Sequence, residues 1–158
     1  MNTPAPSVVA ALESHGLDYR VLVHTAPVRS LAEAAAARGV DVVDVVKTLV
    51  VRRGEGDYLF VLVPGGRSIS WPKLRALLGI SRMSMPPADE AFEATGFVRG
   101  TITPLGSKTA WPVIADVVLA SRGQVTLGSG THDVAIAVEA LPLLEATAAV
   151  VADVTDPE

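Results

Sequence analysis

The sequence of 158 residues contains no cysteine. Disulfide bonds, thiolate catalysis and cysteine-ligated metal sites are therefore excluded. No stretch reaches the roughly 18 uncharged apolar residues that a membrane-spanning helix needs. Residues 1–7 carry no basic leader, and Glu13 interrupts the apolar run that follows, so we expect no signal peptide. These absences lead us to expect a soluble, cytoplasmic protein that makes no contact with a membrane.

Aromatic residues are also scarce, and the apolar part of the chain is mainly Val, Ala and Leu. A chain of this length and composition can bury one substantial core, which predicts a single domain. Positive charge is limited as well, because 13 Lys and Arg face 17 Asp and Glu. The resulting net charge of −4 argues against an extensive nucleic-acid surface. We expect no DNA partner.

The charges are unevenly distributed along the chain. Residues 47–108 hold nine Lys and Arg against five Asp and Glu, whereas the remaining residues hold four against twelve. A locally basic middle could meet a few phosphates on a molecule that is acidic as a whole. The alternative, that these are ordinary solvated charges, stays open at this point.

The residue pattern predicts one α+β domain over residues 1–153 and a C-terminal tail over 154–158. Capping residues, prolines, glycine stops and apolar spacing predict helices, which we expect over 7–14, 31–38, 71–78, 86–95 and 140–146. Alternating or β-branched runs predict strands, which we expect over 19–24, 45–51, 58–63, 82–85, 97–102, 113–119, 124–127, 135–138 and 148–151. Because hairpins are evident and strands do not alternate strictly with helices, we expect a mixed, mostly antiparallel sheet flanked by helices. Such a sheet could curl into a barrel-like form.

Several catalytic motifs are missing. The three histidines lie far apart in the sequence without metal-ligand spacing, and there is neither a phosphate-binding P-loop nor a Gly-x-Ser-x-Gly elbow. We therefore expect no metal ion or other cofactor. The glycine-rich segment 128–132 could bring its backbone close to a ligand, although such loops are common.

Lys47 is the most unusual single residue, because it interrupts an apolar run over 45–51. A strand buried on both faces would not accommodate a charge without a partner. Two interpretations remain open. Lys47 could lie on the solvent face of the strand with its stem along apolar neighbours, or it could place a cation at the mouth of a pocket and bind a carbonyl oxygen or phosphate.

The segment 95–106 is the second unusual feature. Gly100 lies inside the expected strand, which predicts a bulge or a close approach of the backbone to another group. A kinked strand without a functional role is the alternative. Functionally, bare N–H and C=O groups at Gly100 could act with a lysine cation on an ester and its developing oxyanion.

These segments together resemble the YbaK/prolyl-tRNA synthetase-associated domain family of tRNA-editing deacylases. The likeness covers nearly the whole chain and rests on the order and spacing of four segments, which are Tyr19–Thr25, Val46–Val50, Thr95–Gly106 and Gly128–Gly130. The third segment matches a Thr-Gly-Tyr-x-x-Gly-x-Ile-x-Pro-x-Gly pattern, with Phe97 in place of tyrosine. The resemblance implies hydrolysis of the ester between a small, wrongly attached amino acid and the terminal ribose of a tRNA, such as the tRNA for proline.

The resemblance also implies roles for individual residues. Lys47 matches the family's essential lysine and Gly100 its pocket glycine, while water or a substrate group would attack the ester. The substrate-binding residues that the resemblance implies are His24, Thr48, Phe97, Thr101, Gly128, Ser129, Gly130 and His132. The implied partners are the acceptor end of an aminoacyl-tRNA and, in addition, a tRNA synthetase. The acceptor end would meet a limited basic surface that we expect from Arg52, Arg53, Arg67, Lys73 and Arg75.

One departure from the family keeps alternatives open. Ala135 precedes Ile136 where several members carry Asp, and Asp133 lies two residues earlier. The loop could be rearranged, or the amino-acid pocket could differ. A non-catalytic domain of the same fold, which binds an aminoacyl or nucleotide end or a synthetase, is therefore the second hypothesis. A third is a Schiff-base enzyme that uses Lys47.

Overall fold

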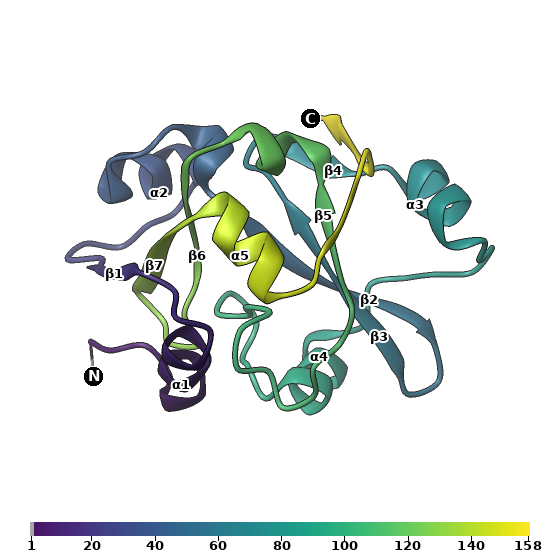
Figure 1. The fold of residues 1–158 in the computed structure, drawn as a ribbon, viewed down its shortest axis with the longest axis horizontal. Coiled ribbons are helices and arrows are strands. Elements are labelled where there is room, and N and C mark those ends of the chain that lie inside the picture. Colours follow the sequence, from purple (N-terminus) through teal and green to yellow (C-terminus); the bar gives the residue numbers. More distant parts are fainter. Residues whose placement is uncertain (1) are drawn as a thin grey trace.

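The computed structural model describes residues 2–158 (Figure 1). The helices are α1 Pro6–Ser14, α2 Leu31–Arg38, α3 Trp71–Leu78, α4 Ala88–Thr95 and α5 Ala140–Ala146, with short 3-10 helices η1 Val42–Asp44 and η2 Val117–Ser121. The strands are β1 Tyr19–Val23, β2 Lys47–Gly54, β3 Asp57–Val63, β4 Arg67–Ile69, β5 Val113–Asp116, β6 Gln124–Gly128, β7 Val134–Glu139, β8 Val150–Ala152 and β9 Thr155–Pro157. The mixture of helices and strands confirms the α+β class.

Helix ends follow the capping signals in the sequence. The Ser30 hydroxyl accepts a hydrogen bond from Glu33 N–H at 3.1 Å at the start of α2. Gly39 ends that helix with φ of 68°, a left-handed conformation that glycine adopts without steric cost. Ser70 caps α3 in the same way as Ser30 caps α2. Local sequence is therefore sufficient to place these helix ends.

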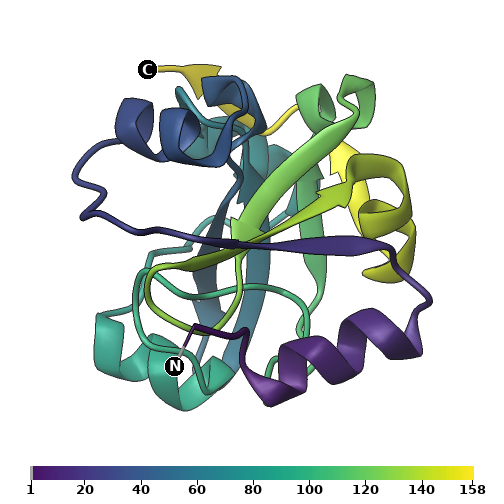
Figure 2. The ribbon, with the colours of Figure 1, turned by 90° about the vertical axis from the view of Figure 1, so that its left-hand side faces the viewer.

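The strands form three sheets. One is a three-stranded antiparallel sheet in the order β1-β7-β6, and another has the order β2-β3-β5-β8, with β2 and β3 antiparallel and the other pairs parallel. Strands β4 and β9 form a small antiparallel pair. Figure 2 shows β1 nearest the viewer, with α2 above it and α1 below. The four-stranded sheet β2-β3-β5-β8 is mixed, as expected. In the part of the chain that the structure describes, none of the sheets closes into a barrel.

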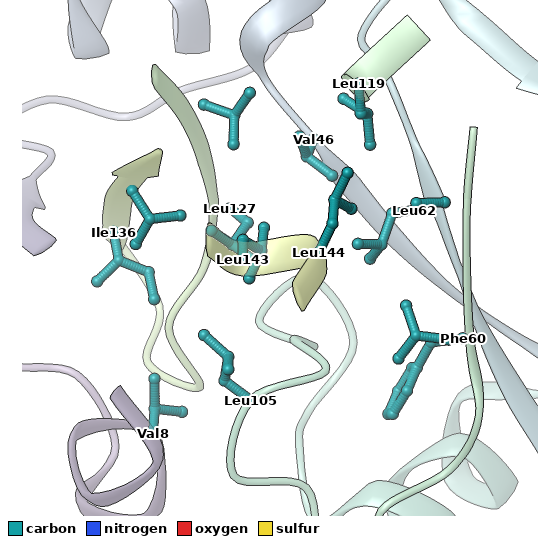
Figure 3. Close-up of a cluster of buried hydrophobic side chains, with 14 of the residues drawn as sticks. Val8, Val46, Phe60, Leu62, Leu105, Leu119, Leu127, Ile136, Leu143 and Leu144 are labelled. Carbon is teal, nitrogen blue, oxygen red and sulfur yellow. The ribbon is translucent and has the colours of Figure 1, made fainter. Parts of the chain in front are cut away.

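The two larger sheets meet around a shared core and at one backbone contact. Val46 N–H donates to Thr126 O at 2.8 Å, which joins the start of β2 to β6. Helix α5 fills the space between the sheets, and Leu143 and Leu144 pack there against aliphatic side chains of both (Figure 3). Burying each such side chain contributes about 1.5–3 kcal/mol to stability. The core therefore fixes the start of β2 against the hairpin of β6 and β7.

Four sequence-based expectations differ from the structure. Residues 82–85 form a single bridge at Ser84 instead of a strand, and β5 ends at Asp116, after which η2 begins. Residues 97–102 are a loop with a turn, because Gly100 adopts φ of 91° and Thr101 N–H bonds back to Val98 O. The segment 154–158, expected as a tail, contributes β9, and Val154 is fully buried. Tertiary contacts outweigh local propensity at these places.

No helix within residues 2–158 is long and apolar enough to cross a membrane.

Candidate active-site cavity

A cavity of about 620 Å³ lies along the first half of β2. Its walls come from the outer edge of β2, the ends of β1 and α2, residues 85–88 before and at the start of α4, the loop around Gly100, and the loop between β6 and β7. Of the residues expected at a site, six line it: His24, Lys47, Thr48, Gly100, Gly128 and His132. Segments far apart in the sequence thus form one cleft.

The outer edge of β2 presents free backbone groups to this cavity. Alternate residues of an edge strand point their N–H and C=O groups toward the partner strand and away from it. Val46 N–H donates to β6 and Arg52 N–H donates to the segment before α4, both on the side away from β3. Thr48 and Val50 lie between these two residues at alternate positions, so their backbone groups point to the same side, and both residues line the cavity. Their backbone N–H and C=O groups therefore face the cleft.

Thr48 adds a side-chain group to this edge. Its Oγ1 is buried and has no hydrogen-bond partner among residues 2–158. A buried hydroxyl without a partner costs free energy, and such groups are uncommon in folded proteins. A ligand in the cavity would supply the missing partner.

Lys47 lies at the rim of the cavity. The strand pleat places its side chain on the face opposite Val46 and Thr48. The Lys47 amine donates to Arg67 O at 3.2 Å and forms an ion pair with Glu158 at 3.1 Å. Its side chain is 39% exposed. The aliphatic part of the Lys47 side chain borders the cleft, while its amine contacts Arg67 in β4 and Glu158.

The two cavity glycines are required for different reasons. Gly100 is exposed at the cavity, and a Cβ there would meet no atom within 4 Å, but φ of 91° disfavours other residues. A Cβ on Gly128 would lie 2.6 Å from Ile102 O, closer than the packing permits. Gly128 thus allows the β6–β7 loop to touch the loop that carries Gly100.

The other four expected site residues lie behind the cavity wall. Phe97 is buried in the main core, and the Thr101 hydroxyl donates to Val98 O at 2.6 Å. Ser129 is fully buried and its hydroxyl donates to Val134 O at 2.7 Å. A Cβ on Gly130 would lie 2.9 Å from the Phe97 ring. In this structure these residues shape the loops and do not line the cavity.

Arg38 and Asp133 line the cavity and were not expected from the sequence. The Arg38 guanidinium donates to His24 Nε2 at 3.2 Å and to the Thr126 hydroxyl at 3.0 Å. The pKa of His24 is lowered, first by burial and then by the Arg38 charge, with Asp133 opposing. A signal did exist in the sequence: Arg38 lies seven residues after Leu31, on the apolar face of α2.

The expected basic surface is largely compensated by carboxylates. Three of its five cations are in ion pairs, which are Arg52–Glu90 at 3.2 Å, Arg53–Asp57 at 2.8 Å, and Lys73 with Asp153 at 3.0 Å and Asp156 at 2.9 Å. Within residues 2–158, no carboxylate lies within the 4.0 Å ion-pair distance of Arg38 or Arg99, and both line the cavity. Two of the arginines that have no ion-pair partner among residues 2–158 therefore line the cleft, while Arg67 and Arg75 of the expected basic surface also have none.

The cavity and its open strand edge belong to a small α+β domain, and a cleft of this volume is in the range that small ligands occupy. The chain belongs to the aminoacyl-tRNA editing domain family, whose model matches residues 25–145. This match confirms the family resemblance found in the sequence.

Similar proteins include two proline–tRNA ligases. That of Trichlorobacter lovleyi is 32% identical over 111 residues, which are 70% of this chain and 19% of the ligase. That of Thermosipho melanesiensis is 36% identical over 97 residues, which are 61% and 17% of the two chains. The matched segment is therefore less than a fifth of either ligase.

Two solved structures match over nearly their whole length. The hypothetical protein APE2540 superimposes with a TM-score of 0.86 and 33% identity, covering 95% of this chain and 99% of that chain. A protein described as a candidate trans-editing enzyme for prolyl-tRNA synthetase gives a TM-score of 0.86 and 31% identity, covering 96% and 98%. This chain thus shares its fold with both solved chains over nearly their full length.

Proposed function

We propose that this domain is an aminoacyl-tRNA deacylase that acts in trans on mischarged tRNA. It hydrolyses the ester between a small amino acid and the terminal ribose, and the tRNA for proline is the first candidate. The observation that carries this proposal is that Lys47, Gly100 and the open edge of β2 line one cavity in a chain of the editing family. The names of the similar ligases and of the similar trans-editing candidate support the choice of tRNA.

The cavity suits a small aminoacyl group. Val46, Ala91 and Ile102 contribute apolar surface to its walls, which favours a short apolar side chain over a charged one. Its volume of about 620 Å³ lies in the range of small-ligand sites and has room for part of the terminal adenosine. Size and wall chemistry together favour a small amino acid on a nucleoside end.

The edge of β2 would hold the substrate. The C=O groups of Thr48 and Val50 can accept hydrogen bonds from the α-ammonium group, and their N–H groups can donate to the ester carbonyl. The exposed backbone at Gly100 faces the same space and can contact the aminoacyl group from the opposite wall. Fixing the ester between two walls places it for attack and lowers the entropic part of the barrier.

The reaction requires no nucleophile from the protein. A water oxygen adds to the carbonyl carbon, and negative charge develops on the carbonyl oxygen. The bond from that carbon to the ribose oxygen then breaks, the ribose oxygen takes the proton that the attacking water gives up, and the free amino acid and tRNA leave. Lys47 would stabilise the developing charge, an electrostatic effect that is worth most where water is excluded.

Lys47 must leave Glu158 to perform this role. Both side chains of that ion pair are partly exposed, at 39% and 52%, and exposed pairs contribute only about 0.2–1 kcal/mol. The lysine stem is flexible enough to redirect the amine from the rim toward an ester in the cleft. The existing contact is therefore a small barrier compared with the gain from a substrate.

The test is ester hydrolysis across tRNAs mischarged with alanine, cysteine and other small amino acids. We expect Lys47→Ala to lower the hydrolysis rate about 100-fold or more, as loss of one oxyanion-stabilising group does. The free energy of unfolding should fall by no more than about 1 kcal/mol, because Lys47 is partly exposed and an exposed ion pair contributes only about 0.2–1 kcal/mol. Lys108→Ala, which removes another exposed lysine outside the cavity, is the control. Undiminished cleavage by Lys47→Ala would remove the mechanism.

A non-catalytic domain that binds the same ligand is the second candidate. The observation that favours it is the Lys47 amine, which already has two partners outside the cleft. Binding of mischarged tRNA without ester loss, for every amino acid in the panel, would establish this alternative. Steady release of free amino acid from any pair would exclude it.

A further inference from the structure

Arg38 is a partly buried cation at the cavity that lacks a carboxylate partner. It lies in the last turn of α2, and its guanidinium donates to the uncharged acceptors His24 Nε2 and Thr126 Oγ1. No carboxylate within residues 2–158 lies within ion-pair distance of it. A guanidinium has five N–H donors, so three remain after these two hydrogen bonds.

His24 completes the group without compensating the charge. Because its Nε2 accepts from Arg38, the neutral ring carries its proton on Nδ1. Burial and the Arg38 charge both lower the His24 pKa, which keeps the ring neutral at pH 7. The pair therefore has a single positive charge and an additional N–H donor, and both residues line the cavity.

The charges around the whole cavity also favour an anionic ligand. Among residues 2–158, Arg38 and Arg99 line it without an ion-pair partner, Lys47 lies at its rim paired with Glu158, and Asp133 is the carboxylate in its wall. The protein as a whole has a net charge of −4, so this excess of positive charge is local. Clefts with charge of one sign concentrate ligands of the opposite sign.

We propose that Arg38, supported by His24, binds a phosphodiester next to the terminal adenosine of the substrate. This assignment rests on the proposed function. The carboxyl group of an aminoacyl ester is itself esterified, so the phosphodiesters are the negative charges common to every aminoacylated acceptor end. Guanidinium groups suit phosphates because they donate two parallel hydrogen bonds. The cation that orients the nucleotide end thus lies inside the cleft, next to the bound ester.

Two alanyl esters distinguish phosphate binding by Arg38 from a general effect of Arg38 on the shape of the site. Alanyl-adenosine has no phosphate, and alanyl-cytidylyl-adenosine has one phosphodiester. We expect Arg38→Ala to raise the KM of the dinucleotide ester about tenfold, as loss of a charged hydrogen bond does, and to leave the nucleoside ester unchanged. Arg38→Lys keeps the charge without the forked geometry and should recover part of the loss. Arg20→Ala, which removes an exposed arginine outside the cavity, is the matched control.

Three outcomes would overturn the assignment. Equal KM increases for both esters would make Arg38 a structural support for His24. An unchanged KM for both would remove it from binding. A KM increase only for an aspartyl-adenosine ester, in place of the dinucleotide ester, would show that the anion is an amino-acid side chain and not the phosphate.

A readout without turnover keeps this proposal separate from the proposed function. Unesterified cytidylyl-adenosine should shift the imidazole NMR signals of His24. These signals are assigned by their absence from the spectrum of His24→Gln. We expect Arg38→Ala to weaken that titration about tenfold and adenosine alone to produce a much smaller shift in the wild type. A protein that cleaves no ester but binds in this way would refute the deacylase and keep the phosphate site. Equal shifts from adenosine and the dinucleotide would refute the phosphate site.

Discussion

The two walls of the cavity are built by different means. One wall is the regular strand β2, paired with β3 and backed by buried aliphatic side chains. The other consists of two loops, around Gly100 and between β6 and β7, whose backbones touch at Gly128. Hydrogen-bonded pairing fixes the first wall, whereas close backbone contact and a left-handed turn fix the second.

This difference predicts different responses to substitution. Side chains of the strand wall project from a framework that does not depend on them, so changing them should alter ligand contacts more than stability. The loop wall begins where the β6–β7 ladder ends, at Gly128, and depends on close backbone contacts beyond that point, so changes at its contact points should alter stability first. The first two predictions below test this contrast, and the third concerns His24 at the end of β1. They are given in order of decreasing size.

Gly128→Ala should produce the largest loss of stability. The added Cβ would lie 2.6 Å from Ile102 O and 2.9 Å from Thr101 O, both of which are backbone atoms that cannot rotate away. We expect the free energy of unfolding to fall by about 2–3 kcal/mol, as overpacking does. Urea denaturation measures this. Gly123→Ala is the control, because its nearest contact would be an ordinary 3.8 Å from a side-chain atom. Equal stability of the two variants would contradict the contrast.

Thr48→Val, in the strand wall, should change stability in the opposite direction to Gly128→Ala. Removing a buried hydroxyl that has no partner within residues 2–158 should raise the free energy of unfolding by about 0.5–1 kcal/mol. Deacylation should slow about fivefold if the substrate is the missing partner. Thr147→Val removes a hydroxyl that already bonds Leu143 O at 2.9 Å and should leave activity unchanged. Lower stability with full activity would show that the hydroxyl serves the fold.

The smallest expected effect is a pH dependence of stability from His24. Its pKa is lowered by burial and by Arg38, so the unfolded chain binds more protons between that value and the ordinary value of about 6.5. The contribution of neutral His24 is present above pH 6.5 and is lost as the pH falls below it. Urea denaturation at several pH values should show a steeper loss in the wild type than in His24→Gln. Identical slopes would contradict the prediction.

The sequence predicted more of the fold than of the cavity. Helix caps at Ser30 and Ser70 and the hairpin of β2 and β3 depend on neighbouring residues, and all of them form as expected. The expected strand over 97–102 does not form, because its apolar residues meet the core from a loop and not from a sheet. The segment 154–158 was expected to be a tail because its pairing with the distant strand β4 cannot be seen in the sequence.

The same division applies to the site. Lys47 and Gly100 stand out in the sequence because a charge and a glycine interrupt apolar runs, and both lie at the cavity. Phe97 and Gly130 carry equally conspicuous patterns, yet they pack against each other behind the wall. The sequence places Arg38 on the apolar face of α2, but only its contacts with His24 and Thr126 identify it as a cavity residue.

Helix ends, the strand that carries Lys47 and the family of the chain can all be predicted from the order of residues. These properties depend on residues within a few positions of one another or on their order along the chain. The backbone groups that face the cleft and the cations without a carboxylate partner become known from the folded chain. Both properties depend on neighbours far away in the sequence, because Arg52 pairs with Glu90 whereas Arg38 donates to His24 and Thr126.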